Sequence, residues 1–220
     1  GAKFYISYGS SGAEANEIAL DLCRTNGHQK GTRILAFEGA FHGRTIMTLQ
    51  ATYNKEKRGP FAFSGYEATF LPFPENKDPD FLPPMPENFL AELKKGHIPT
   101  IPNADDLLKS ELLSLAAVKE EALRGNICAI IIEPMQCEGG DRYATNRFFS
   151  GLRALSRGLN IPLILDEVQT GFNLGRKFFW HQQLNLQDEH GEPDYPDCVT
   201  LAKKAQLGVC LSIWKNPRPS

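Results

Sequence analysis

Short, uninterrupted apolar runs are the clearest pattern along this chain of 220 residues. They show no alternation of polar and apolar positions, which is typical of strands buried on both faces, as in parallel sheets. We therefore expect a mostly parallel sheet at the core. The predicted strands cover residues 33–37, 127–132, 162–165 and 198–202, with further strand-like runs at 4–8 and 209–214.

Between these runs, apolar residues recur at helical spacing. Ala15, Ile18, Ala19 and Leu22 share one face of a helix predicted over residues 13–24. Because helices alternate with strands, we expect β-α-β units and an α/β fold with helices on both faces of the sheet. Further helices are predicted over residues 105–124, 148–159 and 178–186.

Residues 54–105 break this pattern, because they are rich in proline and show no sustained periodicity. Proline restricts the backbone to extended and turn conformations. We therefore expect an irregular surface excursion that covers a site or a subunit contact.

The composition excludes several classes of partner and site. A net charge of −2 and 41% hydrophobic residues are those of an ordinary soluble chain and imply no nucleic-acid or membrane partner. No membrane span or signal peptide is visible, although the abrupt start suggests a fragment. Five scattered cysteines without a CxxC pair indicate free thiols in a reducing compartment, and no metal site.

Charged residues follow three of the predicted buried strands. Glu133, Asp166 and the pair Lys203-Lys204 each come at or just after a strand end. The carboxyl ends of parallel strands meet at one edge of a sheet, where such folds bind ligands. A buried carboxylate such as Asp166 needs a cation. A structural ion pair between Asp166 and a lysine would satisfy this as well as a ligand would.

A second candidate feature is the start of the first helix. Ser11, Gly12 and Ala13 lead from a strand into the helix, whose unpaired N–H groups and dipole favour an anion such as phosphate. The alternative is a serine N-cap with a flexible approach.

The loop after the strand at 33–37 carries Phe41, His42 and Arg44 between glycines. Phe41 could lie flat on an aromatic ligand, and the guanidinium of Arg44 matches a carboxylate. A core phenylalanine, a capping histidine and a surface arginine are the alternative, which we favour for His42.

A phosphate, a flat ring, a ring nitrogen that faces an acid and an aldehyde that faces a lysine together describe pyridoxal 5'-phosphate. The chain also resembles the class III pyridoxal-phosphate-dependent aminotransferases of fold type I, over nearly its whole length. The resemblance is closest to the 4-aminobutyrate and lysine ε-aminotransferase branch. Five motifs agree in order: SGAEANE at 11–17, AFHGRT at 40–45, IIEPMQCEGG at 131–140, LDEVQTGF at 165–172 and TLAKKAQLG at 200–208.

The resemblance implies a role for each candidate residue. Lys204 would be the Schiff-base lysine, since three residues separate it from Gly208, and Lys203 would point to the other face of the strand. Asp166 would keep the pyridine nitrogen protonated. The remaining implied contacts are Gln169 with the ring hydroxyl, Ser11, Gly12 and Ala13 with the phosphate, Phe41 stacked on the ring, and Arg44, Glu133 and Glu138 on the substrate side.

The resemblance also implies the reaction. An ω-amino acid, either 4-aminobutyrate or lysine through its ε-amine, would give its amino group to a 2-oxo acid, with 2-oxoglutarate expected. Transamination of acetylornithine or of a diamine remains open. A different alternative is a catalytically silent piece that only binds the cofactor or dimerises.

Residues 1–220 would form the large, cofactor-binding domain of a longer protein that also has an N-terminal segment and a C-terminal small domain. A homodimer is expected at full length. We expect a cytoplasmic protein, or a mitochondrial matrix protein if a transit peptide precedes this segment. One departure from the family pattern is Val209, where relatives have a second glycine, because its side chain could crowd the cofactor.

Overall fold

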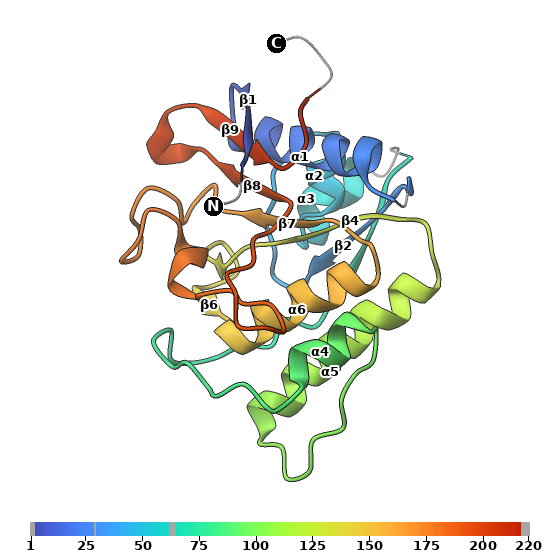
Figure 1. The fold of residues 1–220 in the computed structure, drawn as a ribbon. Coiled ribbons are helices and arrows are strands. Elements are labelled where there is room, and N and C mark those ends of the chain that lie inside the picture. Colours follow the sequence, from blue (N-terminus) through green and yellow to red (C-terminus); the bar gives the residue numbers. More distant parts are fainter. Residues whose placement is uncertain (1–2, 29, 62–64, 217–220) are drawn as a thin grey trace.

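A mostly parallel sheet of seven strands crosses the computed structural model, which describes residues 3–28, 30–61 and 65–216 (Figure 1). The strands are β1 (Tyr5–Gly9), β2 (Arg33–Phe37), β3 (Glu67–Leu71), β4 (Ile127–Ile132), β7 (Leu163–Asp166), β8 (Cys198–Leu201) and β9 (Gly208–Ser212). Their order is β1-β9-β8-β7-β4-β2-β3. Only β9 runs antiparallel to its neighbours. The predicted α/β fold is confirmed.

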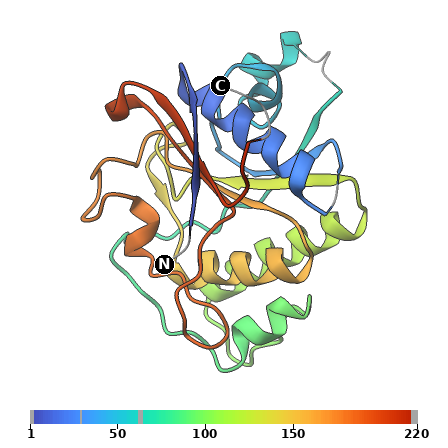
Figure 2. The same ribbon diagram turned by 45° about the horizontal axis from the view of Figure 1, so that its top comes forward.

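Helices cover both faces of the sheet, as Figures 1 and 2 show. One face carries α1 (Gly12–Asn26), with α2 (Ile46–Gln50) and α3 (Lys55–Arg58) beside it. The other face carries α4 (Phe89–Lys94), α5 (Asp106–Leu123) and α6 (Asn146–Gly158). The short elements are β5 (Met135–Gln136), β6 (Arg142–Tyr143), η1 (Gly59–Phe61), η2 (Trp180–Gln183) and η3 (Lys203–Ala205).

The side chains of each central strand divide between two apolar clusters. On β2, Ile34 and Ala36 join the cluster under α1, whereas Leu35 and Phe37 join the larger cluster under α4, α5 and α6. Successive strand residues point to opposite faces. The uninterrupted apolar runs are therefore explained, because both faces of these strands are covered.

The unit β4-α6-β7 has the expected topology, since β7 lies parallel to β4 and directly beside it. β8 then pairs with β7 on the other side, also parallel. The ends of these three strands consequently meet at one edge of the sheet, as predicted from their sequences.

Two predictions about secondary structure were wrong. Residues 54–105 are not wholly irregular, because they contain β3, which pairs with β2 at the sheet edge, and the helices α3 and α4. Residues 178–186 do not form a regular helix and contain only the four-residue η2. That segment is held by Glu167, whose buried carboxylate accepts hydrogen bonds from the backbone N–H groups of Trp180 and His181 and from the His181 ring. The segment also buries Leu184 and Leu186 in the larger apolar cluster, so the polar contacts of Glu167 and these two leucines hold it without a regular helix.

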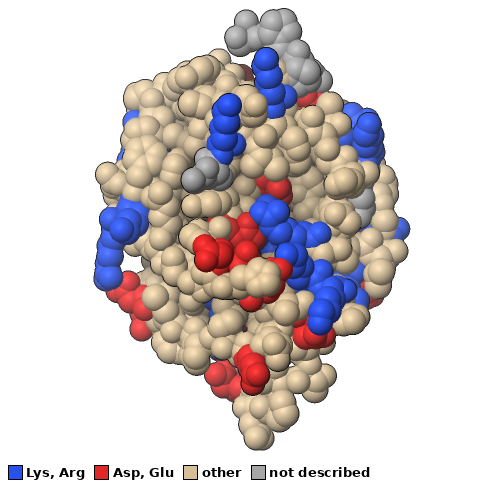
Figure 3. Space-filling model, viewed as in Figure 1, with Lys and Arg blue, Asp and Glu red and all other residues tan. Residues whose placement is uncertain are grey.

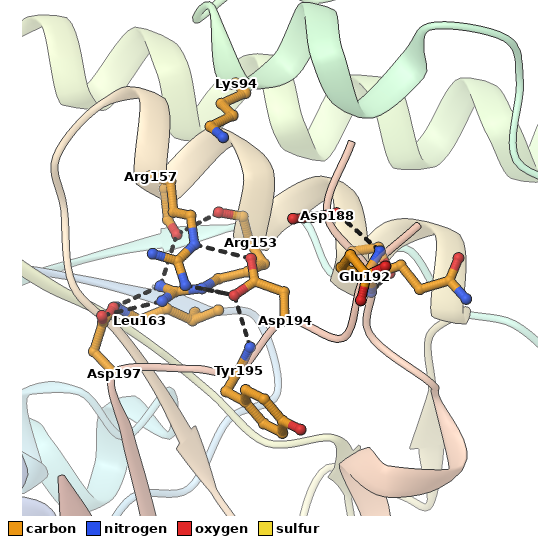
Figure 4. A network of polar contacts seen from close by, with 12 residues as sticks. Lys94, Arg153, Arg157, Leu163, Asp188, Glu192, Asp194, Tyr195 and Asp197 are labelled. Atoms are coloured by element: carbon orange, nitrogen blue, oxygen red, sulfur yellow. Dashed lines mark hydrogen bonds and ion pairs between the residues drawn. The ribbon is translucent and has the colours of Figure 1, made fainter. Parts of the chain in front are cut away.

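A network of arginines and aspartates joins α6 to the start of β7 and to the residues before β8 (Figure 4). These strand starts lie at the opposite edge of the sheet from the carboxyl ends, where the ligand is predicted. Asp197 accepts two hydrogen bonds from the Arg153 guanidinium, at 2.6 and 3.1 Å, and one from the backbone of Leu163 at 2.8 Å. Asp194 accepts a hydrogen bond from Arg157 Nε at 2.9 Å. The buried charges of this network, Arg153, Asp194 and Asp197, are paired, which explains how they can lie inside the protein.

Figure 3 shows acidic and basic side chains next to one another on the displayed face, not a broad patch of one sign. Among the described residues, no helix combines the length and apolar character needed to cross a membrane.

Candidate active site

A cavity of about 470 Å³ lies at the carboxyl edge of the sheet, between the N-terminus of α1 and the ends of β4, β7 and β8. This volume is within the usual range for a small-molecule site. Most of the residues predicted from the sequence line it: Ser11, Gly12, Ala13, Phe41, Arg44, Glu133, Asp166 and Gln169. Asn16, His42 and Lys203 line it as well, whereas Glu138 and Lys204 do not.

The helix start forms one end of the cavity. Ser11 is the N-cap of α1, and its hydroxyl accepts a hydrogen bond from the Glu14 N–H at 3.2 Å. The N–H groups of Gly12 and Ala13 belong to the first turn, where no helical carbonyl can pair with them. The Ser10 N–H is already bonded to the Glu14 carboxylate at 2.6 Å. An anion in the cavity would therefore rely on Gly12 and Ala13.

Asp166 is the last residue of β7 and is almost fully buried. Its Oδ2 accepts hydrogen bonds from Asn16 Nδ2 at 2.7 Å and contacts His42 Nδ1 at 2.8 Å. Its Oδ1 accepts from the Val168 N–H at 3.0 Å, with the Thr200 hydroxyl at 3.5 Å. Several hydrogen-bond donors converge on this carboxylate, so its oxygens are satisfied inside the protein. Within the described part of the chain, no hydrogen bond or ion pair joins Asp166 to Lys203 or Lys204.

Asn16 lines the candidate site and was not predicted from the sequence. Besides the bond to Asp166, its amide donates to the His42 carbonyl at 2.8 Å and accepts from the Thr200 hydroxyl at 2.6 Å. It therefore joins α1, the loop after β2, and β8 around one carboxylate. Its position in the helix carries the signal, because it follows Gly12 by four residues and so lies on the same helix face.

His42 was interpreted wrongly as a capping residue. Its side chain is fully buried against Asp166, and its Nε2 has no hydrogen-bond partner among the described residues. Its backbone N–H donates to the Thr52 hydroxyl at 3.1 Å, which orients the loop. His42 is thus part of the cavity wall and shares a hydrogen bond with its central acid.

Glu133 enters the cavity just after β4 and is 7% exposed. Its Oε2 accepts a hydrogen bond from the Phe41 N–H at 3.2 Å. Burial raises the pKa of this carboxyl well above its usual range, and the nearby negative charges of Asp166 and Glu138 raise it further.

Glu138 lies at the edge of a neighbouring hollow, not in the main cavity. Lys57 pairs with it at 2.7 Å and also lies 5.0 Å from the centre of the Phe41 ring. Hydrogen bonding to Lys57 lowers the pKa of Glu138, and the charges of Arg44 and Lys203 act in the same direction. The prediction that Glu138 faces a substrate remains open. Lys57 lies in the proline-rich segment to which no chemistry was assigned.

The two lysines are oriented differently from the expectation. Lys203 lines the cavity, and its backbone is left-handed, with φ of 47°. The Lys204 ammonium donates to the Phe172 carbonyl at 3.3 Å and is outside the cavity lining. We expected Lys203 to point to the opposite face from Lys204, because side chains alternate along an extended strand. The strand ends at Leu201, however, and η3 begins at Lys203, so strand alternation no longer applies.

Val209 lies in β9, opposite Tyr8 of β1 and Leu201 of β8. Gly208, not Val209, is the position without room for a side chain, because a Cβ there would lie 2.2 Å from the Ser11 carbonyl oxygen. The close approach of β9 to the start of α1 therefore requires Gly208.

Within the described residues, no group of three or more His, Cys, Asp or Glu could hold a metal ion. All five cysteines are free thiols.

Comparison with known proteins gives consistent results. Residues 5–215 match the family described as "Aminotransferase class-III". The chain is 35% identical to a 4-aminobutyrate aminotransferase of Dictyostelium discoideum over 79% of its length, and 33% identical to the mitochondrial 4-aminobutyrate aminotransferase of Sus scrofa over 80%. It spans only 30% and 31% of those two relatives.

Solved structures show the same likeness. A lysine aminotransferase from M. tuberculosis superposes with a TM-score of 0.68 and 26% identity, over 94% of this chain and 44% of that one. An aminotransferase from Vibrio fluvialis, at 18% identity and a TM-score of 0.69, shares the fold.

Proposed function

Because the chain belongs to the class III aminotransferase family, we propose that it is the cofactor-binding large domain of a pyridoxal-phosphate-dependent aminotransferase. The donor is an ω-amino acid, 4-aminobutyrate or lysine through its ε-amine, and the acceptor is a 2-oxo acid, 2-oxoglutarate first of all. The observation that carries this proposal is the buried Asp166, held by Asn16, His42 and the Val168 N–H in a cavity that opens beside a helix N-terminus.

The cavity suits pyridoxal 5'-phosphate. Asp166 presents a carboxylate for a pyridinium N–H, and the first turn of α1 presents N–H groups for a phosphate. His42 Nε2, buried and without a partner among the described residues, is a further polar atom in this wall. When bound, the cofactor supplies an aldehyde that bonds to amines and a ring that withdraws electrons from the substrate carbon.

The residues of the chain then have separate tasks. Asp166 keeps a proton on the ring nitrogen, while Asn16 and His42 hold its carboxylate in place. Gln169 would contact the ring hydroxyl, Phe41 would pack against the ring, and the exposed Arg44 would hold a substrate carboxylate through its planar guanidinium; all three line the cavity. The substrate-side roles of Glu133 and Glu138 belong to the same proposal.

The reactive amine comes from the lysine pair after β8. We assign it to Lys204, on the spacing of the family motif. To enter the cavity, this exposed side chain gives up a single 3.3 Å hydrogen bond to Phe172, which costs little at the surface. Lys203 is the second candidate, because it lines the cavity in the present conformation.

Trapping the covalent bond decides between the two lysines. The chain is mixed with pyridoxal 5'-phosphate, reduced with borohydride, digested and analysed by mass spectrometry. We expect the added mass on Lys204, loss of the 400–430 nm absorbance in Lys204→Ala, and its retention in Lys203→Ala, the matched control. The opposite pattern would assign the reaction to Lys203. No added mass on either lysine would contradict the proposed function.

Amine specificity is tested with the loaded chain. 4-Aminobutyrate or lysine should bleach the 400–430 nm absorbance, and 2-oxoglutarate should restore it. Acetylornithine and a diamine are the competing donors, and bleaching by either alone would reassign the substrate. Cofactor binding without bleaching by any amine would favour the silent, cofactor-binding or dimerisation module.

The complete protein is proposed to be a homodimer. Support comes from apolar side chains that are exposed next to cavity residues, namely Tyr8, Ile46 and Leu207 at 60%, 61% and 41%. Light scattering on the full-length protein, compared with a variant that carries charged residues at Ile46 and Leu207, tests this association.

A further inference from the structure

Two carboxyl groups line the same cavity in opposite surroundings. Asp166 ends β7, and Glu133 directly follows the neighbouring β4. Asp166 accepts hydrogen bonds from the Asn16 amide and the Val168 N–H and contacts the His42 ring. The two carboxyls of the cavity therefore differ in how many hydrogen-bond donors reach them.

Glu133 has far less support for a charge. Its one hydrogen bond in the described part of the chain is the 3.2 Å contact from the Phe41 N–H, although the side chain is almost completely buried. No cation pairs with it among the described residues. A buried carboxylate with one donor and a second carboxylate nearby is costly, and protonation removes that cost.

The charged and titratable groups around Glu133 come from four places. Asp166 lies at the end of β7, Glu138 and Cys137 lie beyond β5, His42 and Arg44 lie after β2, and Lys203 lies after β8. The cations act elsewhere: Arg44 and Lys203 lower the pKa of Glu138. Asp166 and Glu138 both oppose ionisation of Glu133.

We propose that Glu133 carries a proton in the resting protein and serves the cavity as a hydrogen-bond donor to an anionic oxygen of the bound substrate. Its Oε2 is taken by the Phe41 N–H, which leaves Oε1 to carry the proton. A neutral acid can bind a carboxylate without repulsion, whereas an ionised Glu133 would repel it. The identity of the anion rests on the proposed function, since an amino acid and a 2-oxo acid both bring a carboxylate.

The protonation state is tested on the cofactor-free chain by comparing wild type with Glu133→Gln. A carboxyl whose folded-state pKa is raised loses stability as the pH rises from its unfolded pKa, about 4.3, towards the folded value. Near pH 4 the two proteins should therefore have similar melting temperatures, and at pH 8 the glutamine variant should melt higher by several degrees. The quantity to compare is the melting temperature of Glu133→Gln minus that of wild type. A smaller value of this difference at pH 8 than at pH 4 would overturn the proposal.

Glu138→Gln is the matched control, because that exposed side chain is paired with Lys57. It should not melt higher than wild type at pH 8. A gain equal to that of Glu133→Gln would show a general charge effect and would also contradict the proposal.

The donor role is tested with glutarate, a dicarboxylate without an amine, by calorimetry on the cofactor-loaded chain. Glu133→Gln keeps a donor and should bind within about threefold of wild type, whereas Glu133→Ala should bind about tenfold more weakly. Equal weakening in both variants would refute donation by Glu133. Failure of the chain to take up the cofactor would count against the proposed function, and the melting comparison would still decide the protonation state.

Discussion

At the scale of single residues, the site depends on how Asp166 is held. The acid was found from the sequence because it follows a buried apolar run, but its partners were not. Asn16 and His42 come from segments 150 and 124 residues away along the chain. Hydrogen-bond partners this distant follow from the packing of α1 and the β2 loop onto the sheet edge, which local pattern does not encode.

Asn16→Ala is the sharpest residue-scale prediction. The change removes the 2.7 Å bond to Asp166 and leaves the His42 carbonyl without its partner, whereas the Thr200 hydroxyl keeps its 3.5 Å contact with Asp166. Unpaired buried groups cost about 1–3 kcal/mol each, so the free energy of unfolding should fall by roughly that amount, measured by urea denaturation.

Asn26→Ala provides the comparison, because among the described residues its amide donates to the Leu22 carbonyl alone, near the end of α1. Its loss of stability should be below about 1 kcal/mol. Equal losses in the two variants would mean that Asn16 acts only as a helix residue and not as a support for Asp166.

At the scale of elements, buried strands and long helices were predictable and edge elements were not. β2 and β4 begin and end at the predicted residues. β3 was missed because Glu67 and Thr69 interrupt its apolar residues and because prolines follow it. It lies at the sheet edge, where one side is open, so its sequence needs no continuous apolar run.

Gly12 controls how closely α1 approaches the loop after β7. A Cβ at this position would lie 2.5 Å from Cγ1 of Val168. Gly12→Ala should therefore push the helix start away from Val168 and Asp166. We expect a loss of stability of about 1–3 kcal/mol and weaker cofactor binding, measured by denaturation and by absorbance titration.

Gly59→Ala is the control for this prediction, because no atom of the described residues lies within 4 Å of its Cβ position and its backbone is helical. It should leave both measurements unchanged. If Gly12→Ala also left both unchanged, the close contact between helix and loop would not matter for the site.

At the scale of the whole molecule, the prediction of a fold type I large domain with helices on both faces of a mostly parallel sheet is confirmed by the sheet order and by the likeness to the lysine aminotransferase structure. The sequence predicted that the ends of β4, β7 and β8 converge. It could not predict that β1 pairs with β9, because antiparallel pairing between the two ends of the chain leaves no local signal.

Acid stability of the molecule should depend on the arginine–aspartate network of Figure 4. Although burial opposes ionisation of Asp194, Arg157 and Arg153 lower its pKa. Its contribution is therefore present above the unfolded-state pKa of about 3.9 and is lost as the pH falls through the lower folded-state value. Asp194→Asn should be less stable than wild type by roughly 1.5–3 kcal/mol at pH 7, and this difference should shrink below pH 4.

Asp106→Asn is the matched surface variant, because the Asp106 side chain is fully exposed and pairs only with Lys109. Exposed pairs contribute about 0–1 kcal/mol, so its denaturation midpoint at pH 7 should stay close to that of wild type. An Asp194→Asn difference that persisted unchanged at pH 3 would show that packing, not charge, accounts for it.

The pairing of β1 with β9 also has a consequence for the order of events during synthesis. Tyr5 lies opposite Ser212 and Gly9 opposite Gly208, so the first strand of the sheet finds its partner only after almost the whole segment has been made. Contacts between such distant residues form slowly because a long loop must close first. During synthesis on the ribosome, β1 would remain unpaired until β9 has been made. The part of the sheet next to the α1 N-terminus would therefore form last.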